Sequence, residues 1–197
     1  NESALDLTSV RILPDSKGTA GFDVEMKLAN LSQANLDKAI ADTKSGSLLY
    51  VLRFTGGYQV HAVIARYSPA FGWTFKYNDY DTLVTDCYAP PASGGDKCLA
   101  FGANGTNTTG KVDMVNGTVT ITAPKLFPGN AAFLKALQGG TGDQQRPRQV
   151  TATAGTHFFD ASAFTFGDSQ DRPKMVTELQ SYLYPLDNTP AMDFLLP

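Results

Sequence analysis

The chain has two cysteines, Cys87 and Cys98, and their spacing would allow them to react with each other. The ten residues between them include Pro-Pro and Gly-Gly, which are typical of a turn-rich loop. An even number of cysteines at this spacing favours a disulfide, and closing a loop of this size stabilises a fold by roughly 3 kcal/mol. A zinc site is excluded, because His61 and His157 lie at no ligand spacing from the cysteines. We therefore expect a disulfide and an oxidising, extracytoplasmic compartment.

Asn-X-Ser/Thr sequons support an extracellular or cell-surface location. Five of the nine asparagines begin one, and such sequons mark glycosylated surface loops of secreted proteins. Alternatively, Gly-Thr and Thr-rich turns simply recur in extracellular β-proteins. The chain opens at Asn1 without an apolar leader, which indicates a processed chain or an excised fragment. The predicted glycosylation sites are Asn30, Asn104, Asn107 and Asn116.

Acidic residues on predicted turns are candidate calcium ligands, because calcium takes several oxygen ligands in flexible geometry. No segment matches the EF-hand pattern, and a solvated acidic turn is the alternative reading. Calcium is the one cofactor that the sequence suggests. The candidate ligands are Asn78, Asp79, Asp81, Asp168 and Asp171.

Aromatic residues could bind a ligand by stacking. Phe71, Trp73, Phe75 and Tyr77 share one face of a predicted strand, so we expect that face to pack into the core. The tyrosines nearby are the better candidates for surface stacking. They are Tyr58, Tyr67, Tyr80 and Tyr88.

A catalytic arrangement is not expected. Ser162 and Ser169 lie near His157 in the sequence, with Asp160 between them. Nucleophilic catalysis needs a nucleophile, a base and an orienting group, but the chain has no Gly-X-Ser-X-Gly motif. Serine, histidine and aspartate residues often lie close together on a strand by chance. We therefore expect a protein without enzymatic activity.

Strict alternation of apolar and polar residues is the clearest structural signal. Phe22 to Leu28 places apolar residues on one face and charged residues on the other, which predicts a half-buried strand. The apolar run from Ser47 to Phe54 predicts a strand covered on both faces. Asn116-Gly117 predicts a hairpin with a type I′ turn. Further strands are expected over 5–13, 58–67, 71–77, 110–115, 118–123, 149–159, 161–166 and 191–196.

Helical signals are few and short, at 35–43, 131–137 and 171–182. The many short strands predict a single all-β domain over 1–197, an antiparallel β-sandwich of jelly-roll-like type with a few short helices. The 197 residues carry a net charge of −3, which excludes a nucleic-acid interface. No apolar run is long enough to span a membrane as a helix.

The order of elements resembles that of β-sandwich accessory modules in secreted bacterial proteins, such as subtilisin-like proteases. It is also similar to carbohydrate-binding and DOMON-type jelly rolls. The likeness covers most of residues 4–166 and transfers no catalytic residue; the 87–98 loop and the 168–197 tail depart from it. The segments that carry it are Leu-Asp-Leu-Thr-Ser-Val (5–10), residues 22–32, Gly-Trp-Thr-Phe-Lys-Tyr (72–77), Gly-Lys-Val-Asp (110–113), residues 117–124 and Leu-Phe-Pro-Gly (126–129).

The resemblance implies a non-catalytic accessory module of a larger secreted or cell-surface protein that contacts a glycan or a protein surface. A second hypothesis starts from the apolar terminal segments, 5–13 and 191–197. Exposed sheet edges recruit strands from neighbouring chains. The chain would then be a self-assembling subunit of an extracellular filament or surface layer, with copies of itself as partners. In that case, deleting residues 1–10 should abolish assembly without unfolding the rest.

Overall fold

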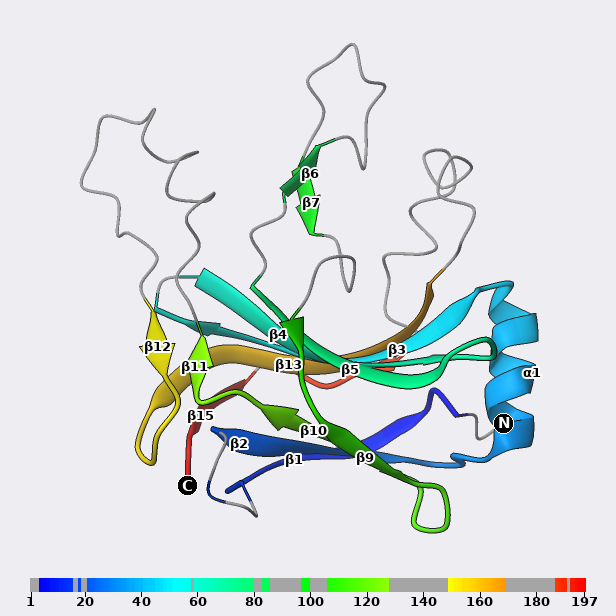
Figure 1. The fold of residues 1–197 in the computed structure, drawn as a ribbon, viewed down its shortest axis with the longest axis horizontal. Helices are drawn as coiled ribbons and strands as arrows, with labels where there is room; N and C mark the ends of the chain where they lie inside the picture. The colour runs from blue at the N-terminus through cyan, green and yellow to red at the C-terminus, as the bar shows by residue number, and fades with distance from the viewer. Residues whose placement is uncertain are drawn as a thin grey trace.

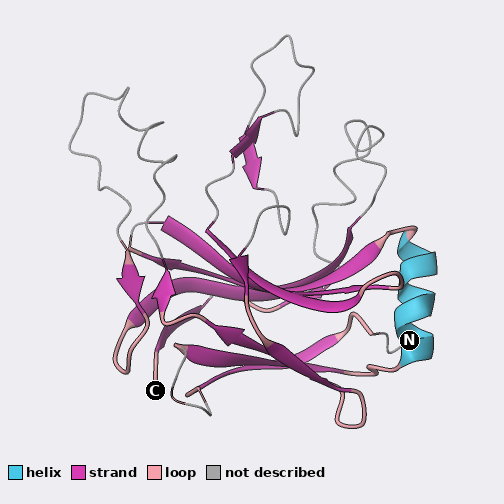
Figure 2. Ribbon diagram, in the orientation of Figure 1, coloured by secondary structure: helices cyan, strands magenta, loops and turns pink. Residues whose placement is uncertain are grey.

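A computed structural model gives the fold of the chain. It describes residues 4–15, 18, 21–57, 59–79, 83–85, 97–99, 106–127, 149–168, 187–190 and 192–197. These residues form antiparallel strands and one helix, and the two main sheets lie in facing layers (Figures 1 and 2). The all-β, sandwich-like fold expected from the sequence is confirmed.

One layer is a four-stranded sheet in the order β1-β2-β10-β9. Alternation in β2 buries Phe22, Val24, Met26 and Leu28 against the other layer, as predicted. The outer face of this sheet carries polar side chains. The strands are β1 (Leu7–Leu13), β2 (Phe22–Leu28), β9 (Gly110–Asp113) and β10 (Thr118–Ala123).

The other layer has the order β14-β13-β3-β4-β5-β8, and β15 also pairs with β13. β3 is buried on both faces over most of its length, as its apolar run predicted. The strands are β3 (Ser47–Gly56), β4 (Gln59–Ser68), β5 (Gly72–Asp79), β8 (Thr106–Asn107), β13 (His157–Asp168), β14 (Asp187–Asn188) and β15 (Met192–Leu195).

Two short strand pairs complete the described structure. β6 (Leu83–Thr85) pairs with β7 (Lys97–Leu99), and β11 (Leu126–Phe127) pairs with β12 (Val150–Thr151). The helices expected over 131–137 and 171–182 lie outside the described residues.

Aromatic rings fill the core between the layers. Phe22 lies 5.8 Å from Phe54 and 6.0 Å from Phe158, centroid to centroid, so rings from both sheets interlock. Trp73 packs against the same core, as its alternating position predicts. Phe71 does not, because it lies in the turn before β5 with 85% of its surface exposed. The expectation that all four aromatics of 71–77 share the buried face was wrong for Phe71.

The helix α1 (Gln33–Thr43) lies across one end of the two layers (Figure 1). Ser32 caps its start by accepting a hydrogen bond from the Asn35 N–H at 3.3 Å. Lys44 ends it in the left-handed conformation, with φ of 50°. Leu36 anchors the helix in the core. Across the described residues, no helix combines the length and apolar character needed to cross a membrane.

The first described residues are held inside the sandwich. Ala4 and Leu5 are buried. The Tyr50 hydroxyl donates to the Ala4 carbonyl at 3.1 Å, and the Thr165 hydroxyl donates to the Leu5 carbonyl at 2.7 Å. Both donors come from the seven-stranded sheet, while the chain continues into β1 of the other sheet. The segment therefore joins the two layers.

Candidate functional site

A polar groove lies on the outer face of the four-stranded sheet. It is open to solvent, with a volume of about 520 Å³. The side chains that line it come from all four strands and from the β9–β10 turn. They are Ser9, Arg11, Glu25, Lys27, Lys111, Asp113, Asn116, Thr118 and Thr120.

Strand pairing explains why eight of these nine residues meet, and the β9–β10 turn adds Asn116. Side chains directly opposite one another on paired strands lie on one face of the sheet. The register therefore sets them in two rows that run across the strands. One row is Arg11, Glu25, Thr120 and Lys111, and the other is Ser9, Lys27, Thr118 and Asp113.

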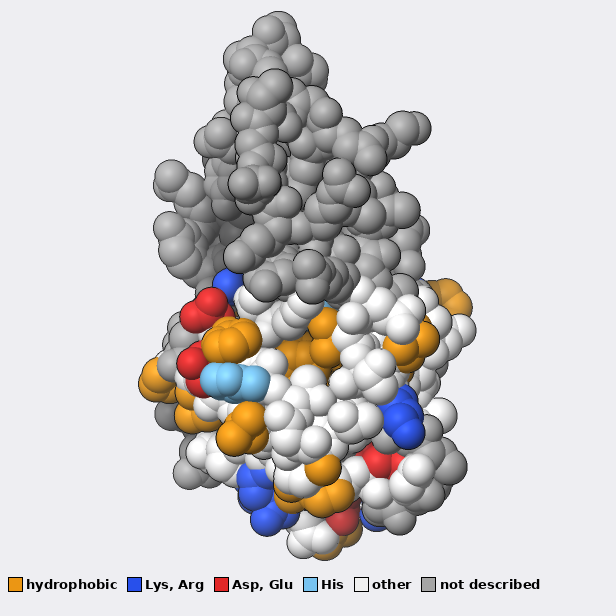
Figure 3. Space-filling model, turned by 90° about the vertical axis from the view of Figure 1, so that its left-hand side faces the viewer, with side chains coloured by type: hydrophobic (Ala, Val, Ile, Leu, Met, Phe, Trp, Pro, Cys, Tyr) orange, Lys and Arg blue, Asp and Glu red, His pale blue; other side chains and the backbone are white. Residues whose placement is uncertain are grey.

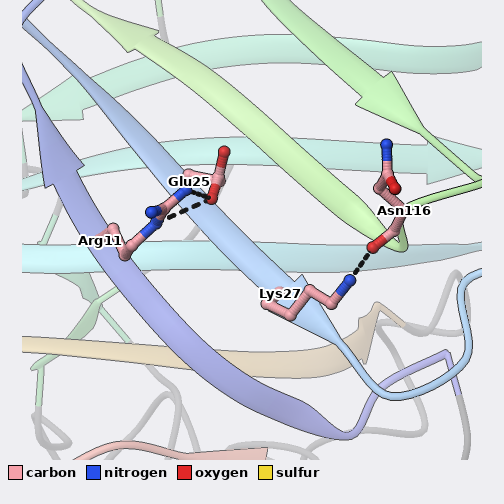
Figure 4. Close-up of polar contacts among 4 residues, drawn as sticks. All are labelled: Arg11, Glu25, Lys27 and Asn116. Atoms are coloured by element: carbon pink, nitrogen blue, oxygen red, sulfur yellow. Dashed lines mark hydrogen bonds and ion pairs between the residues drawn. The ribbon is translucent and has the colours of Figure 1, made fainter.

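Charges in the two rows alternate in sign. Arg11 donates to Oε1 of Glu25 from Nε at 3.0 Å and from Nη2 at 2.5 Å (Figure 4). Lys27 donates from Nζ to the backbone carbonyl of Asn116 (Figure 4). Both bonds from Arg11 end on the same carboxylate oxygen, which leaves Oε2 of Glu25 without a hydrogen-bond partner in the described structure.

The β9–β10 turn forms one wall of the groove. Oδ1 of Asp113 accepts hydrogen bonds from the N–H groups of Val115 at 3.0 Å and Asn116 at 2.9 Å, and Oδ2 accepts from the Asn116 amide at 2.8 Å. These bonds hold the pKa of Asp113 below its ordinary value of 3.8. The bonds from Asn116 contribute most, and the charge of Lys111 adds to them.

The predicted type I′ turn was wrong, although the hairpin itself is present. β9 ends at Asp113 and β10 starts at Thr118, so four residues connect them. Gly117 has φ of 64°, while Asn116 is not among the described residues with positive φ. A type I′ turn needs positive φ at both central residues. The side chain of Asp113 instead caps the turn, as Asx-type bonding does elsewhere.

Three of the predicted glycosylation sites lie among the described residues. Asn30 and Asn107 are exposed, the former after β2 and the latter on β8. Asn116 is exposed in the turn at the edge of the groove. Asn104 lies outside the described residues.

The structure describes the side chain of none of the five predicted calcium ligands. Asn78 and Asp79 end β5 and Asp168 ends β13, with only their backbones described. Asp81 and Asp171 lie outside the described residues. Among all residues that the structure describes, no three or more His, Cys, Asp or Glu side chains lie close enough together to hold a metal ion.

The predicted stacking surface does not hold for Tyr67. This residue is buried in the core, and its hydroxyl accepts a hydrogen bond from Gln33 at 2.6 Å and donates one to Asp37 at 3.3 Å. Its position on the inner face of β4, in register with Trp73, explains the burial. Tyr58, Tyr80 and Tyr88 lie outside the described residues.

The disulfide also stays a prediction. Cys87 lies outside the described residues, and Cys98 is described only as part of the backbone of β7.

The two histidines have separate surroundings. His61 is fully buried, with Nε2 at 3.1 Å from the Gly56 carbonyl. His157 lies at the start of β13, and its Nε2 is 3.9 Å from Oδ2 of Asp193. Ser162 lies further along β13, opposite Arg53.

The groove can bind a polar ligand by hydrogen bonds and charge. Within the described residues, the hydroxyls of Ser9, Thr118 and Thr120 form no hydrogen bonds, so they can donate to a ligand or accept from it. Both carboxylates already have partners: Glu25 binds Arg11, and Asp113 is ionised and binds the turn. A general acid needs a raised pKa, which is the opposite of what Asp113 has.

Sequence reasoning missed the groove, because no local motif carries it. Its residues come from positions 9 to 120 and meet only through strand pairing. The one local signal was the polar face of 22–28. Comparison with protein-family models, curated proteins and solved structures gave no match.

Proposed function

We propose that the chain is a non-catalytic extracellular binding module, an accessory part of a larger secreted or cell-surface protein, and that it contacts a glycan through the groove. The observation that carries the proposal is the pair of polar rows across four strands. The sheet fixes the backbone positions of these residues, and hydrogen bonds hold the side chains of Arg11, Lys27 and Asp113 before a ligand arrives, which lowers the entropic cost of binding.

The charges of the groove favour an acidic glycan. Three cations, Arg11, Lys27 and Lys111, face two carboxylates, Glu25 and Asp113, while the whole chain carries −3. The groove is thus locally more positive than the molecule. Hydrogen bonds between a cation and a ligand carboxylate are stronger than neutral ones. The charge of Lys111 acts on Asp113, but within the described structure its ammonium forms no hydrogen bond, so it can donate one to a ligand carboxylate.

The intrachain pairing of the described terminal strands favours this proposal over strand exchange between copies. β1 pairs with β2, and β15 pairs with β13. The expected disulfide, glycosylation and secretion agree with an extracellular module and form part of the proposal.

Affinity electrophoresis tests the proposed function. Native gels with and without polygalacturonate would compare the wild-type protein with a Lys27→Gln, Lys111→Gln variant. The matched control is Lys38→Gln, Lys44→Gln, which makes the same charge change on exposed residues at α1. We expect the acidic polysaccharide to retard the wild type and the control, less so at high salt.

The groove variant should lose the retardation. Equal retardation of all three proteins, or of none, would overturn the assignment of an acidic glycan to the groove. Neutral laminarin in a parallel gel separates charge-driven binding from recognition of hydroxyl groups alone.

A further inference from the structure

A mixed aromatic and acidic patch lies at the start of β13, away from the groove. Figure 3 shows hydrophobic and acidic side chains gathered around a histidine on this side of the molecule. His157 and Phe159 stack with ring centroids 4.1 Å apart and an angle of 40° between their planes. Phe159 is nevertheless 45% exposed. A ring that is supported from one side and exposed on another offers a binding surface.

The backbone at this position is irregular. The register of β13 shifts between Phe159 and Ser162 against β3, and between Phe158 and Ala161 against β15. Asp160, inside this bulge, has φ of 49°, in the left-handed region that non-glycine residues seldom adopt. Bulges redirect side chains and recur next to binding and active sites.

A carboxylate holds the bulge in place. Oδ1 of Asp193 accepts a hydrogen bond from the Asp160 N–H at 3.1 Å, and Oδ2 lies 3.9 Å from Nε2 of His157. Strained backbone persists only where its surroundings fix it. Asp193 therefore connects Asp160 to the stacked rings of His157 and Phe159, and all four residues are exposed.

We propose that this patch is a second binding site, which takes a single neutral β-linked pyranose ring. Such a sugar has an apolar face of axial C–H bonds and an edge of hydroxyl groups. The negative face of an aromatic ring attracts the C–H bonds, and carboxylates accept strong hydrogen bonds from hydroxyls. Near Phe159, Asp160 and Asp193 supply those acceptors.

Charge separates this ligand from that of the groove. The patch contains two carboxylates and no lysine or arginine among its described members, so an acidic sugar would be repelled. The groove contains three cations. We therefore expect the two sites to bind different ligands, and an experiment can refute the proposal for one site without refuting the other.

An NMR titration tests the site. Amide shifts of the ¹⁵N-labelled wild-type chain would be followed as methyl β-D-glucopyranoside is added. We expect saturable shifts for residues 157–160 and 192–195. Phe159→Ala should weaken binding about tenfold, the value of one aromatic contact, while Phe159→Trp should retain it. The matched control is Phe71→Ala, which removes another exposed phenylalanine and should change nothing.

Asp193→Asn adds a test of the acidic part of the site. The amide oxygen can still accept from the Asp160 N–H, but the charge is lost, so we expect weaker binding with the bulge intact. Unsaturable shifts, or equal affinity of wild type and Phe159→Ala, would overturn the proposal. So would shifts at these residues that depend on protein concentration alone, because they would assign the patch to self-association.

Discussion

Asp113 connects the stability of the β9–β10 turn to the shape of the groove. Its carboxylate accepts two backbone hydrogen bonds and one side-chain hydrogen bond, and its pKa is held below 3.8 as a result. The Asn116 carbonyl at the same turn receives the Lys27 ammonium. A single ionised side chain thus fixes the position of a groove wall.

Asp113→Asn keeps the side-chain shape and removes the charge. We expect the wild type to be more stable than this variant at neutral pH, because the turn binds the ionised form. The pKa of Asp113 is lower in the folded than in the unfolded chain, so this advantage is fully present above pH 3.8. It should disappear as the pH falls through the lower, folded-state pKa.

Urea unfolding of both proteins, from neutral to strongly acidic pH, measures this difference. Other titrating groups are shared and cancel. A stability difference that stays constant over the whole range would show that the turn does not depend on ionisation of Asp113.

The contact between β9 and β5 depends on a glycine. A Cβ atom built on Gly110 would lie 2.3 Å from the Phe75 ring and 2.6 Å from the Thr120 carbonyl oxygen. Neither the half-buried Phe75 ring, which packs against the core, nor the backbone of β10 can move away without disturbing its own packing. Only glycine therefore lets β9 approach the other sheet at this point.

Gly110→Ala should lower the free energy of unfolding by about 1–3 kcal/mol, the cost of overpacking a core. The control is Thr109→Ala, which removes an exposed side chain one residue earlier and should stay within about 0.5 kcal/mol of wild type. Chemical denaturation measures both. Equal stability of Gly110→Ala and wild type would mean that the two sheets are further apart at this point than the structure places them.

Strands could be predicted from the sequence where one face is apolar. The alternation of 22–28 gave the bounds of β2, and Ser47 begins β3 as expected. Periodicity states which residues share a face, but it does not state which strands pair. The groove and the patch at the start of β13 both depend on pairing between strands that are distant in the sequence. Tyr67 was misplaced because a tyrosine can be buried when its hydroxyl finds partners, here Gln33 and Asp37.

At the scale of the whole molecule, the described residues at both ends of the chain are part of the sandwich. Leu5 and Leu196 are both buried. The Leu196 N–H donates to the Thr156 carbonyl at 3.0 Å, which fastens the end of β15 to the segment before β13. Among the described strands, β1 is the edge strand of its sheet and β15 pairs only with β13, so each keeps one unpaired edge. Donating either strand to a second copy would first break its pairing within the chain and expose buried Leu5 or Leu196.

Deleting residues 1–10 should therefore destabilise the whole sandwich, contrary to the expectation from sequence that the rest would stay folded. The deletion removes buried Ala4 and Leu5 and more than half of β1. Loss of one buried leucine alone costs about 2–5 kcal/mol, so we expect a large fall in the urea midpoint or no cooperative transition. Tyr50→Phe and Thr165→Val, which remove only the hydroxyl bonds to this segment, should each cost about 1 kcal/mol. If the truncated chain unfolds at the same urea concentration as the full chain, the segment is an appendage, and strand exchange between copies becomes the better account.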